Sequence, residues 1–168
     1  MLRQPGTLCA QHLSAGRPDR ETGSNTDIYW NPSSFGASQE AYITFTNIDP
    51  LADEIDLLLK SQSSAGWGNG VLEILYEPVN SRVQVWTYTG VQNWVQRGAS
   101  IPVTFSNGDQ LGARAKANGQ VEVYRNGALL ATRDITGWPL YANGGCIGLR
   151  MIGASNTVMD NFGGGTVP

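Results

Sequence analysis

The sequence predicts an all-β protein built as a sandwich of two antiparallel sheets. Short runs of alternating apolar and polar residues succeed one another from Asp27 onward, which is the periodicity of half-buried strands. The dipeptide Asn-Gly, a strong turn signal because both residues tolerate positive φ, separates these runs at 69–70, 107–108, 118–119, 126–127 and 143–144. No helical periodicity of useful length interrupts this pattern of strands and turns.

The chain divides into a lead, one domain and a short tail. Residues 1–26 show neither periodicity and are expected to form a poorly ordered or atypical lead, whereas 27–162 form the sandwich. The Gly-rich segment 163–168 is interpreted as a C-terminal linker. Strands are expected, in chain order, at 27–30, 40–48, 54–61, 70–77, 82–88, 94–97, 109–117, 121–125, 128–135, 146–152 and 157–162.

Two hairpins are specific enough for a register. In the first, residues 79–80 form the turn, which pairs Ile74 with Val85 on the buried side and Glu73 with Trp86 on the outer side. In the second, a three-residue loop at 118–120 pairs the alanines of 109–117 with the valines of 121–125. This second register leaves outward the side chains of Arg114, Lys116, Glu122 and Tyr124.

The outer face of the first hairpin has the composition of a sugar-binding surface. Pyranose CH faces stack on aromatic rings, and sugar hydroxyls need planar polar partners. Rings, amides and carboxylates meet on this face and at its border in Glu73, Gln84, Trp86, Tyr88, Arg82 and the glycine-flanked Trp67. The alternative is that this is the ordinary outer face of a sheet, with cross-strand pairs and no ligand.

Composition excludes several functions. The formal net charge is −3, so no basic field exists to attract nucleic acid. No apolar run approaches the roughly 18 residues of a membrane span, and the first residues lack the apolar stretch of a signal peptide. His12 is the sole histidine and no Cys-x-x-Cys occurs, so a zinc site is not expected. We expect no cofactor; the one ion worth considering is a structural calcium at Asp160.

Four stretches carry a resemblance to a known family. They are Glu-Ile-Asp-Leu-Leu-Leu-Lys at 54–60, Val-Gln-Val-Trp at 83–86, the segment from Asn-Gly-Asp-Gln-Leu at 107–111 to Val-Tyr-Arg-Asn-Gly at 123–127, and Gly-Gly-Cys-Ile-Gly-Leu at 144–149 with Met-Asp-Asn-Phe at 159–162. Together they resemble the concanavalin A-like (laminin G-like) jelly-roll modules of secreted bacterial proteins. Residues 1–26 depart from the resemblance, because the opening strand phrase of such modules is missing there.

The resemblance implies a fold and a set of partners. It implies a jelly roll with one concave sheet and a non-catalytic, lectin-like role, in which the face described above recognises a polysaccharide. It also implies an extracellular location within a larger protein, with neighbouring domains as further partners. The alternative is a structural or adhesion spacer without a small ligand.

An enzymatic role is a further alternative. The phrase at 54–56 resembles the start of the catalytic strand of retaining jelly-roll β-glucanases, which would assign Glu54 and Asp56 to a glycoside hydrolase or polysaccharide lyase. Such a hydrolase needs two carboxyls about 5–5.5 Å apart. The second glutamate of that strand is replaced by Leu58, which cannot transfer a proton. Glu73 or Glu77 could substitute only if the order of strands brings one of them close.

Overall fold

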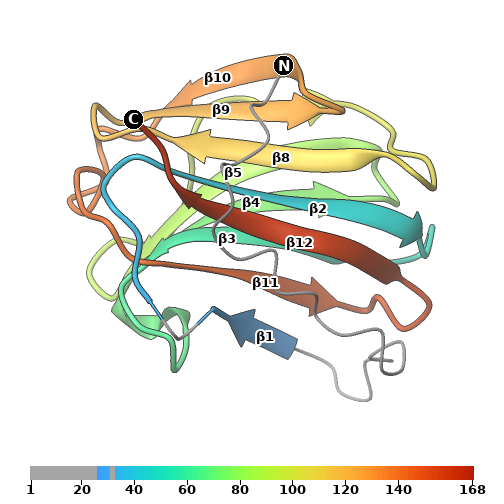
Figure 1. The fold of residues 1–168 in the computed structure, drawn as a ribbon, viewed down its shortest axis with the longest axis horizontal. Coiled ribbons are helices and arrows are strands. Elements are labelled where there is room, and N and C mark those ends of the chain that lie inside the picture. Colours follow the sequence, from blue (N-terminus) through green and yellow to red (C-terminus); the bar gives the residue numbers. More distant parts are fainter. Residues whose placement is uncertain (1–25, 31–32) are drawn as a thin grey trace.

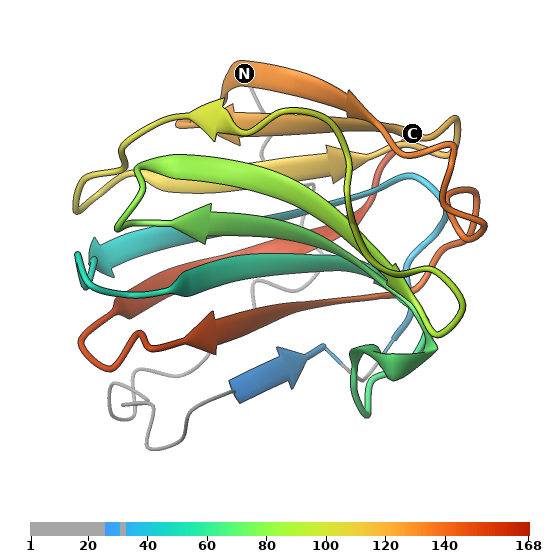
Figure 2. The ribbon, with the colours of Figure 1, turned by 180° about the vertical axis from the view of Figure 1, so that it is seen from behind.

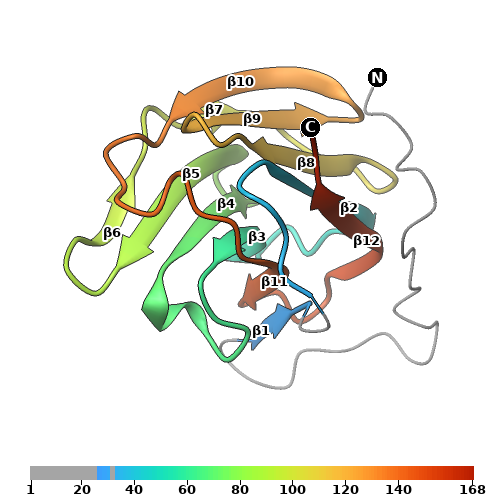
Figure 3. The ribbon, with the colours of Figure 1, turned by 60° about the vertical axis from the view of Figure 1, so that its left-hand side comes forward.

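The computed structural model describes residues 26–30 and 33–168 of the 168-residue chain. Two antiparallel sheets stack face to face here, as Figure 3 shows. Within the described residues one short 3-10 helix, η1 (Trp67–Asn69), occurs, and none of them forms a helix able to cross a bilayer. The strands are β1 (Thr26–Tyr29), β2 (Gln39–Asn47), β3 (Glu54–Ser61), β4 (Val71–Glu77), β5 (Arg82–Thr89), β6 (Asn93–Gln96), β7 (Ile101–Pro102), β8 (Gln110–Ala115), β9 (Gln120–Arg125), β10 (Ala128–Asp134), β11 (Cys146–Ile152) and β12 (Val158–Thr166).

The strand order mixes distant parts of the chain. The first sheet has the order β1-β11-β3-β4-β5-β6, with the short β7 beside β5, and the second has the order β10-β9-β8-β2-β12. Figure 1 shows β11 between β1 and β3, and Figure 2 shows the same order from behind. The predicted all-β, two-sheet antiparallel jelly-roll sandwich is therefore confirmed.

The core lies between the two sheets. Alternate residues of the central strands point inward, because successive side chains of a strand face opposite ways. A fully buried aliphatic or aromatic side chain contributes about 1.5–3 kcal/mol to folding. The largest fully buried set comprises Ile55, Leu57, Leu59, Leu72, Ile74, Tyr76, Ile43, Phe45, Leu111 and Trp138. Trp138 also donates its indole N–H to the carbonyl of Tyr88 (3.0 Å).

The first hairpin has the predicted register. Ile74 pairs with Val85 and Glu73 pairs with Trp86 across β4 and β5. Residues 78–81 connect the strands, with the N–H of Ser81 donating to the carbonyl of Pro78 (3.1 Å) around the expected central pair 79–80.

The predicted register of the second hairpin is wrong by two residues. Ala115 pairs with Val121, and the loop is 117–119, because the N–H of Lys116 donates to the carbonyl of Gln120 (2.8 Å). Gly119 has φ +85° and takes the last place of the three-residue loop, where the left-handed conformation is needed. A shift of two residues keeps every side chain on its predicted face.

The interpretation of 163–168 as a linker is wrong for Gly163–Thr166. These residues complete β12 and pair with β2, with Gly164 opposite Ala41. A Cβ on Gly164 would collide with the carbonyl oxygen of Glu40, so glycine allows the two backbones to approach. The predicted lead, 1–26, lies outside the described residues except for Thr26, which begins β1.

Lys60 ends β3 and ties three segments together. Alternation would place it on the face of Glu54 and Asp56, as a counter-charge to both, but this expectation is wrong. Its φ is +49°, and its ammonium group donates hydrogen bonds to the carbonyls of Ala37, Tyr141 (2.7 Å) and Asn143 (3.0 Å). Burial lowers the pKa of Lys60 to about 8. Lys60 is thus a buried clamp at one end of the sandwich.

Replacing Lys60 with Met should reduce the free energy of unfolding by about 3 kcal/mol, because three carbonyls lose a charged donor. Urea unfolding measures the change. The matched control is Lys116→Met, which breaks a half-exposed ion pair with Glu122 and should cost under about 1 kcal/mol. Equal losses of unfolding free energy in the two variants would contradict a stabilising role for the hydrogen bonds of Lys60.

Candidate functional site

A groove of about 570 Å³ runs over the outer face of the first sheet, the face turned away from the core. Its walls come from β3, β4, β5, β6 and β11, so five strands contribute side chains to one surface. They include Glu54, Glu73, Arg82, Trp86, Trp94 and Arg150. This is the face on which the sequence predicted a binding surface.

Strand register explains why these side chains meet. Residues directly opposite one another in neighbouring strands share a face of the sheet. One row across the sheet runs through Leu58, Glu73, Trp86 and Gln96. The next row runs through Asp27, Arg150, Asp56, Leu75 and Gln84. The members of these rows that line the groove are Glu73, Trp86, Gln96, Leu75, Gln84 and Arg150.

An aromatic cluster closes one end of this face. Trp67, from η1, lies edge-on to Tyr88 with ring centroids 4.7 Å apart, and Trp94 lies 5.5 Å from Trp67 and 5.1 Å from Tyr88. The guanidinium of Arg150 stands 5.7 Å from the Trp67 ring and 5.9 Å from the Trp94 ring. Trp86 stands apart and donates its indole N–H to Oε1 of Gln84 (3.0 Å).

The structure brings all of the predicted ligand-binding residues to one side of the molecule. Glu73, Gln84, Trp86 and Tyr88 point outward from β4 and β5, and Trp67 contacts Tyr88. Arg82 forms an ion pair with Glu77 beside the groove, as the predicted register requires. Binding by these residues remains a prediction.

Three residues of the face were missed: Trp94, Gln96 and Arg150. Strand alternation could have indicated their face. Trp94 and Gln96 flank Val95 in β6, and Arg150 lies between the buried Leu149 and Met151 in β11. The sequence does not show which strands are neighbours, because β11 pairs with β3 although the two lie far apart in the chain.

Three carboxyl groups converge at the groove: Glu54 and Glu73 line it, and Asp56 is fully buried outside its lining. Glu54, Asp56 and Glu73 each bring one carboxylate oxygen within 4.8 Å of the others. Asp56 is fully buried and neither of its oxygens has a hydrogen-bond partner; Glu73 is 4% exposed and its Oε1 also lacks one. Nε of Arg150 lies 3.7 Å from Glu54 and 3.9 Å from Glu73, near enough for charge attraction but too far for hydrogen bonds.

Burial sets the protonation of this cluster. Desolvation raises the pKa of Glu73 to about 8, although the positive charge of Arg150 opposes the shift. Desolvation also raises the pKa of Asp56 well above its usual range, and the neighbouring charges of Glu73 and Glu54 add to the increase. Asp56 and Glu73 therefore titrate as a coupled pair that retains a proton at neutral pH.

Among the described residues, these three carboxylate oxygens lie close enough together to surround a cation. Arg150 already places a positive charge among them, and a calcium ion would need six to eight oxygen ligands. Asp160 is not part of this group. It lies exposed on β12 and accepts the N–H of Asn161 (2.7 Å), so calcium at Asp160 remains a prediction.

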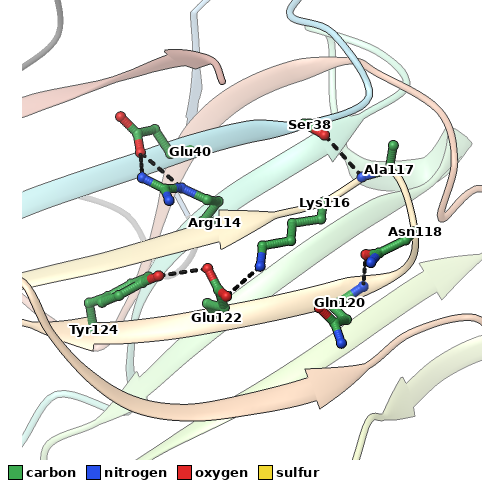
Figure 4. Close-up of polar contacts among 9 residues, drawn as sticks. All are labelled: Ser38, Glu40, Arg114, Lys116, Ala117, Asn118, Gln120, Glu122 and Tyr124. Atoms are coloured by element: carbon green, nitrogen blue, oxygen red, sulfur yellow. Dashed lines mark hydrogen bonds and ion pairs between the residues drawn. The ribbon is translucent and has the colours of Figure 1, made fainter. Parts of the chain in front are cut away.

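The outer face of the second sheet provides a contrast. Its charges are paired with one another, as Figure 4 shows: Arg114 binds Glu40 (2.9 Å), and Glu122 accepts hydrogen bonds from Lys116 and Tyr124. No comparable set of buried, unpartnered carboxylate oxygens is found there among the described residues. The two outer faces thus differ in kind.

Comparison with known proteins identifies the fold. A scan of protein-family models gives no match, and a search of curated protein sequences gives none. The carbohydrate-binding module CBM66 from Bacillus subtilis superposes with a TM-score of 0.63 at 14% identity, over 86% of this chain and 84% of that one. Sheep galectin-11, in complex with glycerol, gives 0.56 at 13% identity over 86% and 99% of the two chains.

A third similar structure is a glycoside hydrolase family 16 endo-glucanase from Bacteroides ovatus, with a TM-score of 0.57 at 11% identity over 79% of this chain and 70% of that one. The chain therefore has the jelly-roll sandwich fold that the sequence resemblance implied.

Glu73→Gln should flatten the decrease in stability between about pH 5 and pH 8. In the wild type the folded state holds a proton on this carboxyl up to about pH 8, whereas the unfolded chain releases it near 4.5, so the folded state binds more protons in this window. Stability is therefore greatest at the acidic end and is lost as pH rises through the folded pKa. Thermal unfolding at several pH values measures the slope.

The control for this experiment is Glu122→Gln. Burial raises the pKa of Glu122, but hydrogen bonds from Lys116 and Tyr124 lower it to a greater extent, so its contribution is complete at the acidic end of the window. Its slope should equal that of the wild type. A Glu73→Gln variant with an unchanged slope would show that this carboxyl is not protonated in the folded state.

Proposed function

We propose that the chain binds a carbohydrate in the groove on the outer face of its first sheet. The observation that carries the proposal is the row in which Trp86, Glu73 and Gln96 lie side by side over three strands. A sugar ring has apolar CH faces and a rim of hydroxyls, so it needs a flat aromatic surface flanked by planar acceptors and donors. This row supplies both.

Further residues of the groove fit the same ligand. Trp94 adds a second half-buried indole, and the amide of Gln84 fixes the indole of Trp86 by accepting its N–H. Because part of each ring is already held by neighbours, little side-chain freedom remains to be lost on binding. The groove is pre-organised for a rigid, hydroxyl-rich ligand.

The charge of the groove favours neutral sugars over acidic ones. Its lining holds the guanidinium groups of Arg82 and Arg150, and both of these already face carboxylates. An anionic polymer would have to displace those pairings. We therefore propose an uncharged polysaccharide as the ligand class.

The fold neighbours support this proposal. They include a protein named as a carbohydrate-binding module, a galectin and an endo-glucanase, so chains of this shape serve saccharide ligands in several settings. The predicted extracellular location within a larger protein rests on the sequence resemblance alone.

Trp86→Ala should weaken retention on insoluble or soluble polysaccharides by about tenfold or more, because a stacking ring contributes roughly 1–2 kcal/mol. A pull-down against a panel of neutral and acidic polysaccharides, with affinity measured for any that retain the protein, tests it. The matched control is Tyr124→Ala on the outer face of the second sheet, which should leave retention unchanged. Equal retention by wild type and Trp86→Ala would refute the assignment of the site.

A further inference from the structure

By sequence alone, strand β3 lacks one of the two carboxyl groups that a retaining hydrolase needs. Glu54 stands at its start, but Leu58 stands where a second carboxyl of the same strand would be needed. The structure supplies that carboxyl from the neighbouring strand, because Glu73 of β4 pairs directly with Leu58 and shares its face. The alternative catalytic pair suggested by sequence, Glu54 with Asp56, places its second member fully below the surface.

We infer that Glu54 and Glu73 form the catalytic pair of a glycoside hydrolase that retains anomeric configuration. The inference rests on the proposed carbohydrate binding in the same groove and adds a reaction to it. Both side chains line the groove, so both reach the ligand's surface. The pair is assembled across two strands rather than along one.

The separation of the carboxyls selects the stereochemistry. One oxygen of Glu54 and one of Glu73 lie within 4.8 Å of each other. Retaining enzymes hold their two carboxyl groups about 5–5.5 Å apart, whereas inverting enzymes need about 6.5–9.5 Å to admit a water molecule between acid and base. Because the nearest oxygens of this pair are within 4.8 Å, the spacing fits the retaining arrangement better than the inverting one.

The environments of the two carboxyls assign their roles. Glu73 is 4% exposed, has an unpartnered oxygen, and faces Asp27, Glu54, Asp56 and Arg150; burial keeps it protonated at neutral pH. A protonated carboxyl is the acid that the leaving oxygen needs. Burial raises the pKa of Glu54 as well, but Glu54 is more exposed than Glu73 and is the carboxyl nearest to Arg150, at 3.7 Å, whose positive charge favours its ionised form. It is the nucleophile.

Asp56 acts as a positioning residue. It is fully buried with both oxygens unpartnered, and one of its oxygens lies within 4.8 Å of a carboxylate oxygen of each glutamate. Its negative charge or its shared proton controls which of the neighbouring carboxyls is protonated. It does not line the groove, so it does not touch the sugar.

The reaction balances with water as the second substrate. Glu73 gives its proton to the glycosidic oxygen while a carboxylate oxygen of Glu54 attacks the anomeric carbon; the bond to the leaving alcohol breaks and an ester to Glu54 forms. Glu73, now a carboxylate, takes a proton from water, whose oxygen attacks the same carbon and releases Glu54. Two displacements restore the original configuration and both side chains.

The test uses the purified full chain and each polysaccharide of the panel that it retains. Wild type should release reducing ends, and the first sugar formed should keep its anomeric configuration by NMR. Glu54→Gln and Glu73→Gln should each lower release by about 1,000-fold, far more than any loss of retention, and Glu122→Gln on the second sheet should change neither. Circular dichroism and thermal unfolding check that the variants fold.

Azide distinguishes the two roles. Added to Glu73→Ala with an aryl glycoside that carries a good leaving group, azide should give a glycosyl azide of retained configuration. Added to Glu54→Gly, it should give the opposite configuration, because it then replaces the nucleophile.

The outcomes separate the two proposals. Retention without release by the wild type overturns the reaction and leaves carbohydrate binding standing. Release that survives in both glutamine variants, or a product of inverted configuration, also overturns it. Absence of both retention and release overturns the binding proposal and this inference with it.

Discussion

The position of β3 between β11 and β4 is the constraint on which the rest of the site depends. Its inner side chains, Ile55, Leu57 and Leu59, are fully buried, and a slip of one residue would turn all three toward solvent. The core therefore fixes the pairing of β3 with both neighbours. Because outer and inner faces share one register, the same constraint places Arg150 beside Asp56 and Glu73 beside Leu58.

Whether the sequence could predict a contact depends on how far apart its two residues lie in the chain. The pairing of Glu73 with Trp86 depends on a short hairpin, so periodicity and turn chemistry were sufficient to predict it. Arg150 depends on a strand that returns from the far end of the chain, and alternation gives its face but not its neighbour. Lys60 escaped prediction for a different reason: its positive φ breaks the alternation from which its face was deduced.

The two outer faces show two ways of treating carboxylates. On the second sheet Glu122 accepts hydrogen bonds from Lys116 and Tyr124, and its pKa is lowered despite partial burial. On the first sheet Glu73 and Asp56 lose water without gaining comparable donors, and their pKa values rise. Desolvation without pairing costs folding free energy. The large buried core offsets that cost, and two carboxyl groups at the groove keep oxygens that lack hydrogen-bond donors.

The proposed carbohydrate binding and the proposed hydrolysis use different residues of the same groove. A ring such as Trp86 contacts a sugar equally in its ground state and in a transition state, so it contributes affinity without lowering the barrier. A protonated Glu73 interacts more strongly as negative charge develops on the leaving oxygen, so its contribution falls on the barrier. Glu73 and Trp86 are nevertheless cross-strand partners. A sugar stacked on this ring would therefore lie next to the proposed acid, because β4 pairs with β5.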